Sequence, residues 1–200
     1  MTAKRTTSAR LDPRRPLVLD TRELGRRAGS MCAVRRTVPA PAGLGLELIA
    51  VPACSDLRLD IRLESVMEGV LVSGTVHADV AGECARCLEP FTDSVGVDVQ
   101  ELFVYAGSTT DTTTEDDEVS RLEQDLLDLE PVVRDAVVLA LPMTPLCDPD
   151  CAGLCAGCGR HLDELPEGHT HDLPDPRWAA LAEKFGSAAD DDSEQSRRTR

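Results

Sequence analysis

The sequence "LRLDIRLESV", residues 57 to 66, alternates apolar and charged side chains over its first eight positions. The apolar positions are Leu57, Leu59, Ile61 and Leu63. Successive side chains of a β-strand point to opposite faces, so a period of two is typical of a strand with one buried and one exposed face. These residues therefore predict a half-buried strand.

Three neighbouring stretches continue the alternation on both sides of this strand. They are "LELIAVP" (46–52), "GVLVSGTVHADVAGEC" (69–84) and "FTDSVGVDVQELFVY" (91–105). Gly69 fits the turn between the second strand and the third. Together the four stretches predict an antiparallel sheet of about four strands, which could curl into a barrel.

One amphipathic helix is expected to pack across this sheet, which makes the predicted fold class α+β. In "LEPVVRDAVVLALP", residues 129 to 142, Pro131 suits the first turn of a helix. Apolar residues then recur at spacings of three and four until Pro142 ends the run, namely Val133, Val137, Val138 and Leu141. A second short helix is predicted in "DPRWAALAEKF", residues 175 to 185.

The other segments are expected to flank this α+β domain. Residues 1–16 lack apolar periodicity and are predicted to form a disordered basic arm. The domain is predicted over 17–142, with the domain proper beginning near Leu46 and an exposed acidic loop at 109–120. Beyond it we expect a cysteine-rich zinc-knuckle segment with the short helix at 143–185 and a disordered tail at 186–200.

Composition and charge limit the classes of function. The sequence has only one Trp, one Tyr and three Phe, so its core must be mainly aliphatic. Such a modest core could need a stabilising cross-link. The sequence has no apolar run of membrane-spanning length and no secretion signal at its start, so we expect a cytoplasmic protein. Residues 1–36 carry a net charge of +7, which leaves −22 for the rest of a chain of net charge -15. A basic arm can contact phosphates, and an acidic body suits basic proteins as partners. The alternative is that both are ordinary solvated surface.

Four cysteines fall within twelve positions in "CDPDCAGLCAGCGR", residues 147 to 160. Cys155 and Cys158 form a knuckle, in which two thiolates from one tight turn bind a tetrahedral ion at about 2.3 Å each. The small Gly157 and Gly159 are expected to relieve the backbone there. In a reducing compartment clustered thiols more often bind a metal than form disulfides, which remain the alternative.

Two sets of residues could complete this site. His169 and His171 lie on one face if their segment is extended, and imidazole is a good zinc ligand. Cys147 and Cys151 could serve instead, which would leave the histidines free. The spacing does not choose between these sets.

A further pair, Cys84 and Cys87 in "CARCLEP", also has ligand spacing. It could complete a site with the C-terminal knuckle or bind a metal separately. One structural zinc ion is preferred over two. Cys32 and Cys54 have no neighbour at ligand spacing and are interpreted as small apolar residues.

Two chemical alternatives are weaker. A redox Cys-x-x-Cys would follow a strand in a βαβ unit, and neither pair does so. A catalytic zinc site would need an open position and a nearby carboxylate such as Glu164 or Glu167, but no metallohydrolase signature accompanies them.

Four blocks of the chain resemble, in the same order, the YceD-type large ribosomal RNA subunit accumulation proteins of bacteria. The blocks are "ECARCLEPFTDSVGVDVQELF", "DLLDLEPVVRDAVVLALPMTPLC", "GLCAGCGRHLDELP" and "DPRWAALAEKF". The likeness covers roughly residues 17–185. Members of that family are implicated in the synthesis, processing or stability of 23S ribosomal RNA, without a known catalytic activity.

The resemblance also bears on the cysteines. Many relatives have cysteines at the six ligand-spaced positions and others lack them, which suits a structural staple better than a catalytic centre. His169 and His171 fall where some relatives carry cysteines, a replacement consistent with metal binding. The six positions are Cys84, Cys87, Cys147, Cys151, Cys155 and Cys158.

The resemblance therefore implies a non-enzymatic factor acting on ribosomal RNA or its precursor. Basic large-subunit ribosomal proteins are a second expected class of partner, whereas a membrane or a small-molecule substrate is not expected. The alternatives are a zinc-ribbon module in transcription, which the acidic body disfavours, and a thiol-disulfide redox protein. The residues expected to bind RNA are Arg10, Arg14, Arg15, Arg26, Arg27, Arg35 and Arg36.

Overall fold

The computed structural model describes residues 11–113, 119–171 and 176–178. The chain divides into two compact units, Met1–Cys151 and Ala152–Arg200, and each is described by itself. Most of the predicted arm, the tail at 186–200 and most of the helix predicted at 175–185 lie outside the described residues. No helix among the described residues is long and apolar enough to cross a membrane.

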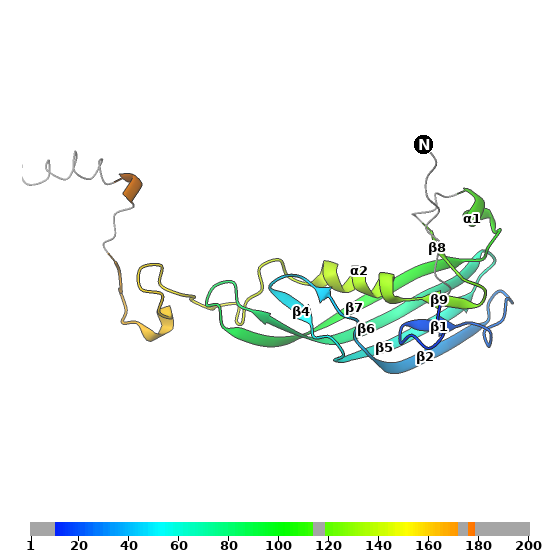
Figure 1. Cartoon of the computed structure of the whole chain (residues 1–200), viewed down its shortest axis with the longest axis horizontal. Coiled ribbons are helices and arrows are strands. Elements are labelled where there is room, and N and C mark those ends of the chain that lie inside the picture. Colours follow the sequence, from blue (N-terminus) through cyan, green and yellow to red (C-terminus); the bar gives the residue numbers. More distant parts are fainter. Residues whose placement is uncertain (1–10, 114–118, 172–175, 179–200) are drawn as a thin grey trace, which may run out of the picture. The chain divides into compact units, whose positions relative to one another are not determined.

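The first unit is built on one large sheet that is antiparallel except where β7 meets β8 (Figure 1). The middle strand β6 pairs with β7 along one side and with β5 and then β4 along the other. The strands are β2 (Met31–Pro39), β3 (Leu44–Gly45), β4 (Ile49–Val51), β5 (Asp56–Ser65), β6 (Gly69–Glu83), β7 (Pro90–Val104) and β8 (Ser120–Arg121).

The predicted period of two is confirmed in β5. Leu57, Leu59, Ile61 and Leu63 are all buried on one face, while the charged residues between them are exposed. The stretches predicted at 69–84 and 91–105 form β6 and β7. A continuous apolar face therefore runs across the three long strands.

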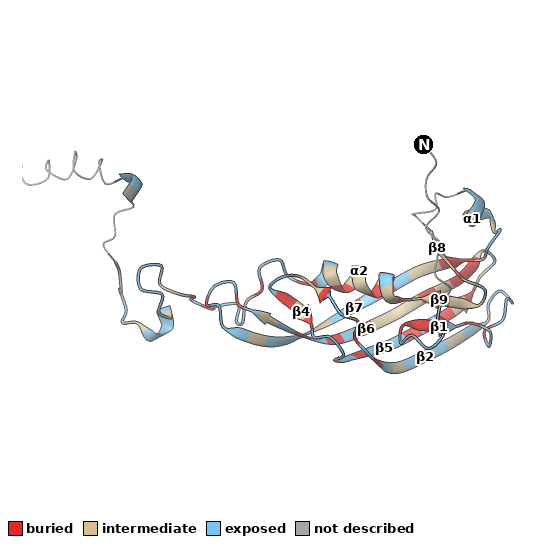
Figure 2. Ribbon diagram, viewed as in Figure 1, coloured by how far each residue is buried: buried red, intermediate tan, exposed pale blue. Residues whose placement is uncertain are grey.

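The apolar face of the sheet is covered by a second layer. This layer consists of α2 (Glu130–Ala140) and a two-stranded ribbon of β1 (Val18–Asp20) and β9 (Leu126–Asp128). Val133 and Val137 of α2 and Leu127 of β9 are fully buried, as the helical spacing predicted for the two valines. The buried residues of both layers, which form one apolar core, are coloured red in Figure 2.

The barrel alternative is wrong, because the sheet stays open. Among the described residues, β2 pairs with β5 and β8 pairs with β7, but these edges do not join each other. An apolar sheet face must be buried either by closing the sheet or by another layer. Here α2 and the β1–β9 ribbon bury it, so closure is not needed.

The prediction that the domain proper begins near Leu46 is also wrong, because β2 precedes Leu46 and pairs with β5. Cys32, Val34 and Val38 face inward on β2, but Arg36 takes an inward position and breaks the apolar alternation. Its guanidinium donates to the carbonyls of Pro16 and Val18 at 2.6 and 3.2 Å. Partial burial lowers the pKa of Arg36, and these two bonds compensate the buried charge.

Short helices complete the described structure. The predicted acidic loop begins with the single-turn α1 (Thr109–Thr113), and Asp111 there accepts a hydrogen bond from Arg121 of β8 at 2.6 Å. In the second unit there are two 3-10 helices, η2 (Leu162–Glu164) and η3 (Pro176–Trp178).

Candidate metal centres

Cys84 and Cys87 lie in the six-residue turn that joins β6 to β7. The Cys84 amide donates to the Glu89 carbonyl at 2.9 Å, and the Leu88 amide donates to the Cys84 carbonyl at 2.9 Å. This tight turn directs both thiols to one side, and both cysteines are buried. The turn is the knuckle geometry that the spacing predicted.

Cys147 and Cys151, which follow α2, meet this knuckle. Their sulfurs lie 3.6 Å from Cys87 Sγ and 3.8 Å from Cys84 Sγ, respectively. The four sulfurs all lie within 4.8 Å of one another. A tetrahedron with metal–sulfur bonds of about 2.3 Å has edges of about 3.8 Å, which the two sulfur–sulfur distances of 3.6 and 3.8 Å match, so the group is suited to a zinc ion. We call these four cysteines the first centre.

Backbone and side-chain contacts hold the segment after α2 against the knuckle. The Ala85 amide donates to the Pro145 carbonyl at 2.8 Å. The Arg86 guanidinium donates to the Cys151 carbonyl at 2.8 Å and to the Pro149 carbonyl at 3.4 Å. A cation beside four sulfurs also offsets the negative charge that thiolates would carry.

The thiols of the first centre differ in their pKa values. Burial raises the pKa of Cys84, but backbone amides of Cys147, Cys87 and Arg86 outweigh it and lower the pKa to about 6. The Cys87 thiol and burial raise the pKa of Cys147 to about 12. Four adjacent thiols cannot all ionise unaided, whereas a divalent cation would stabilise four thiolates together.

Cys155, Cys158, His169 and His171 form a second group, which we call the second centre. Its ligand atoms also lie within 4.8 Å of one another. Cys158 Sγ lies 3.7 Å from His169 Nε2, which lies 2.8 Å from His171 Nε2. Two thiols and two imidazoles are a common donor set for structural zinc. Cys158 and His171 are exposed, unlike most of the first centre.

The two knuckles share one backbone conformation. The Gly159 amide donates to the Cys155 carbonyl at 2.7 Å, as the Leu88 amide does to Cys84. Gly159 has φ +70° and Leu88 has φ +61°, so both occupy the left-handed region. Backbone amides of Cys158 and Gly157 lower the pKa of Cys155, which favours the thiolate a metal needs.

Gly157 has a different role from the one predicted. It has no left-handed φ, and the equivalent position of the first knuckle holds Arg86, so the turn itself does not require glycine. A Cβ at Gly157 would lie 2.4 Å from the ring of His171. Glycine at this position therefore lets the imidazole lie directly against the knuckle.

Leu88 stores backbone strain that glycine would remove. A non-glycine residue in the left-handed region costs about 1–2 kcal/mol, and the Leu88 side chain is 64% exposed, so it gains little from burial. We expect Leu88→Gly to raise the free energy of unfolding by about 0.5–1 kcal/mol in chemical denaturation. Gly159→Ala should act in the opposite direction, and a destabilised Leu88→Gly would contradict this reading.

The structure groups the predicted ligands in a way that the sequence left open. Cys84 and Cys87 join Cys147 and Cys151, a combination that the spacing did not suggest. The C-terminal knuckle joins the two histidines, as one of the two alternatives predicted. All eight cysteines are free thiols, and Cys32 and Cys54 lie outside both groups.

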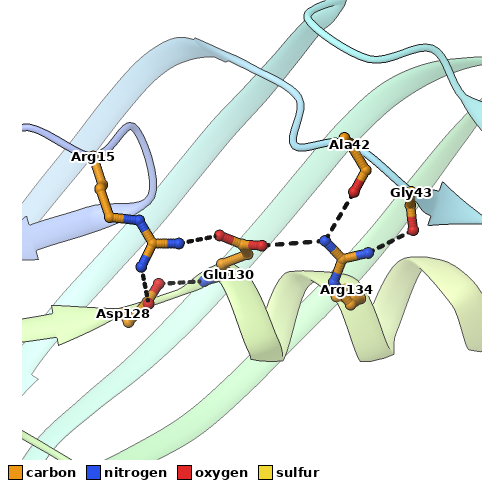
Figure 3. A network of polar contacts seen from close by, with 6 residues as sticks. All are labelled: Arg15, Ala42, Gly43, Asp128, Glu130 and Arg134. Atoms are coloured by element: carbon orange, nitrogen blue, oxygen red, sulfur yellow. Dashed lines mark hydrogen bonds and ion pairs between the residues drawn. The ribbon is translucent and has the colours of Figure 1, made fainter. Parts of the chain in front are cut away.

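Arg15, predicted to bind RNA, takes part in an ion-pair network at the start of α2 (Figure 3). Its guanidinium contacts Asp128 at 3.2 Å and Glu130 at 2.5 Å. Glu130 also pairs with Arg134 at 3.1 Å, and Arg134 donates to the carbonyls of Ala42 and Gly43. The network ties the N-terminal segment and the loop before β3 to the helix.

Three more of the predicted RNA-binding arginines have partners within the chain. Arg35 pairs with Asp60 at 3.0 Å, and Arg26 pairs with Asp125 at 3.6 Å and lies over the Tyr105 ring. Arg36 holds β1 as described above. Arg14 and Arg27 are exposed, and Arg10 lies outside the described residues.

The fold and the two centres define an open-sheet protein with two cysteine-rich groups suited to structural metal. The chain belongs to the family described as "Large ribosomal RNA subunit accumulation protein YceD", which matches residues 72–183. That span includes most of β6, the whole of β7 and α2, and every ligand of both centres.

The chain is similar to several uncharacterized bacterial proteins. It is 52% identical to Rv2926c of Mycobacterium tuberculosis over 88% of this chain and 84% of that protein. It is 46% identical to ML1660 of Mycobacterium leprae over 84% and 77%, respectively. YlbN of Bacillus subtilis is 28% identical over 64% of this chain and 73% of that protein. No solved structure matches the chain.

Proposed function

We propose that this protein is a non-enzymatic factor that supports the synthesis, processing or stability of 23S ribosomal RNA. The observation that carries the proposal is the family match, which spans the central strands, the helix and both centres. A role in ribosome biogenesis follows from the family. Such a factor would act in the cytoplasm.

The first centre supports a structural role for the metal. Four protein ligands leave no open position for water or substrate, which is the arrangement of structural rather than catalytic zinc. A zinc ion there would fasten the segment after α2 to the turn between β6 and β7. The protein would thus present a rigid surface to a partner and not a reactive metal.

The charge distribution favours a limited contact with RNA. A body of charge −22 repels phosphates, and Arg35 and Arg58 on the outer sheet face are paired with Asp60 and Asp79. The arm and Arg27 remain as candidate phosphate contacts. A basic large-subunit ribosomal protein would suit the acidic body as a second partner.

Removing residues 1–36 would delete β1 and most of β2, so the arm must be tested by substitution. We expect Arg14→Ala combined with Arg27→Ala to reduce the slope of log K against log salt for ribosomal RNA by about 2. Arg35→Ala is the control, since Asp60 already neutralises it, and should change the slope less. Filter-binding at several salt concentrations measures the slope. An unchanged slope in the double variant would remove these residues from the interface.

Ultraviolet crosslinking in growing cells tests the proposed function. The full chain is purified after irradiation and the attached RNA is sequenced. We expect discrete sites in 23S RNA or its precursor. Enrichment of DNA would instead support a module in transcription, and background RNA alone would contradict direct contact with 23S RNA.

A thiol-disulfide redox function is favoured by the lowered pKa values of two cysteines, Cys155 and Cys84, although burial acts against the lowering at Cys84. A structural metal site and a redox site predict different thiol reactivity and different metal content in the native protein. A structural metal protects the thiols of the first centre from alkylation, whereas a redox protein reacts rapidly and contains no metal.

A further inference from the structure

The second unit has a defined conformation without an apolar core. Among the residues of this unit whose burial the structure describes, 152–171 and 177–178, no apolar side chain is buried. Backbone hydrogen bonds nevertheless define its turns, from the Cys155 amide to the Arg160 carbonyl at 2.8 Å and from the Leu162 amide to the Gly153 carbonyl at 2.9 Å. A segment of this length needs another source of stability, because a few hydrogen bonds do not offset the conformational entropy lost on ordering.

The second centre lies where that stability is needed. Its two cysteines come from the knuckle near the start of the segment and its two histidines from near the end of the continuous described stretch. A metal bound to all four would close the loop between positions 158 and 169, which contains η2. Metal binding and folding are coupled in small modules built in this way.

The backbone around the second centre is adapted to its ligands. His169 and His171 both direct Nε2 into the group, with ring centroids 4.5 Å apart and ring planes at 83°. The bare backbone of Gly157 admits the His171 ring, since a Cβ would overlap it. Nothing in the turn requires this glycine, so the fit of His171 explains it best.

We propose that Cys155, Cys158, His169 and His171 bind a second divalent cation of the zinc type, and that this ion rather than an apolar core folds residues 152–171. The sequence favoured one ion, so the proposal adds a separate site with its own donor set. Two thiolates and two imidazoles leave the complex neutral, whereas the four thiolates of the first centre carry a net charge of about −2. The proposal does not rest on the ribosomal role.

Exposure distinguishes the two ions further. Two of the four ligands of the second centre, Cys158 and His171, are exposed, whereas in the first centre only Cys147 is exposed. A chelator reaches exposed ligands more readily, so the second ion should leave first. The sheet of the first unit should keep its fold at that stage, because its core does not involve the second centre.

Cobalt substitution of the full chain tests the proposal. We expect two equivalents of Co²⁺ to bind, one with the visible spectrum of a four-thiolate site and one with that of a two-thiolate, two-imidazole site. His171→Ala should lose the second spectrum and keep the first. His161→Ala, a histidine of the same unit outside the group, should retain both.

Gly157→Ala is the sharper variant, because it retains every ligand and alters only the fit of His171. We expect roughly 10–100-fold weaker Co²⁺ binding at the second centre and unchanged binding at the first. In nuclear magnetic resonance spectra of the unaltered chain, the amide signals of residues 152–171 should lose their dispersion when one equivalent of metal is removed. A single equivalent in the unaltered chain, unchanged affinity in Gly157→Ala, or dispersed signals without metal would overturn the proposal.

Discussion

Cys87→Ser is expected to abolish tight metal binding at the first centre and to lower the free energy of unfolding of the sheet unit by about 4 kcal/mol or more. Cys87 is buried and its Sγ lies 3.6 Å from Cys147 Sγ, and serine is a poor zinc ligand. Without the ion, the segment after α2 loses its attachment to the β6–β7 turn. Metal analysis of the purified protein and denaturant unfolding measure the two effects.

Cys54→Ser is the matched control for this experiment. Cys54 is an exposed free thiol outside both centres, so its replacement should change neither the metal content nor the stability of the chain appreciably. If Cys87→Ser kept the full metal content and unaltered unfolding, the first centre would not be a metal site.

Leu127→Ala is expected to destabilise the first unit by about 2–5 kcal/mol. Leu127 of β9 is 0% exposed and packs in the layer that covers the sheet. Shortening it leaves a cavity between the β1–β9 ribbon and the sheet, which the surrounding core fills only in part. Denaturant unfolding of the purified variant measures the effect.

Leu139→Ala is the control within the same covering layer. Leu139 lies on α2 but is 85% exposed, so we expect a change within about 0.5 kcal/mol. Equal effects of the two substitutions would contradict the view that the ribbon and the helix, rather than barrel closure, bury the apolar face.

The fold was predictable where periodicity alone sets the structure. Leu57 to Leu63 show a period of two, and Val133 and Val137 a helical one, because each element is buried on one side. β2 was not predicted, because Arg36 occupies an inward position and interrupts the apolar alternation. The charge of Arg36 is stabilised there by backbone carbonyls of a segment some 18 residues away. The β1–β9 ribbon joins residues more than 100 positions apart, which no local pattern reports.

The candidate ligands were predictable, but their grouping was not. A Cys-x-x-Cys spacing indicates a knuckle from the sequence alone, whereas the partners of a knuckle depend on the tertiary fold. Cys84 meets Cys151 only because β6 ends beside the segment that follows α2. The contact between Gly157 and His171 spans 14 positions and has no signal in the spacing.

The contacts of the arginines show that net charge alone does not identify a binding surface. The excess of basic residues in 1–36 suggested a basic arm that can contact phosphates. In the structure, Arg15 and Arg36 contact β1 and the start of α2. Charge counts include such structural pairs, so they overstate the surface that remains for RNA.

The ratio of 23S to 16S ribosomal RNA, measured after depletion of this protein from its native cells, tests the central claim most directly. We predict a lowered ratio that the unaltered chain restores and that Leu139→Ala, as a control variant, also restores. Cys87→Ser should fail to restore it when the variant is present at equal level. An unchanged ratio after complete depletion would contradict a role in the accumulation of 23S ribosomal RNA.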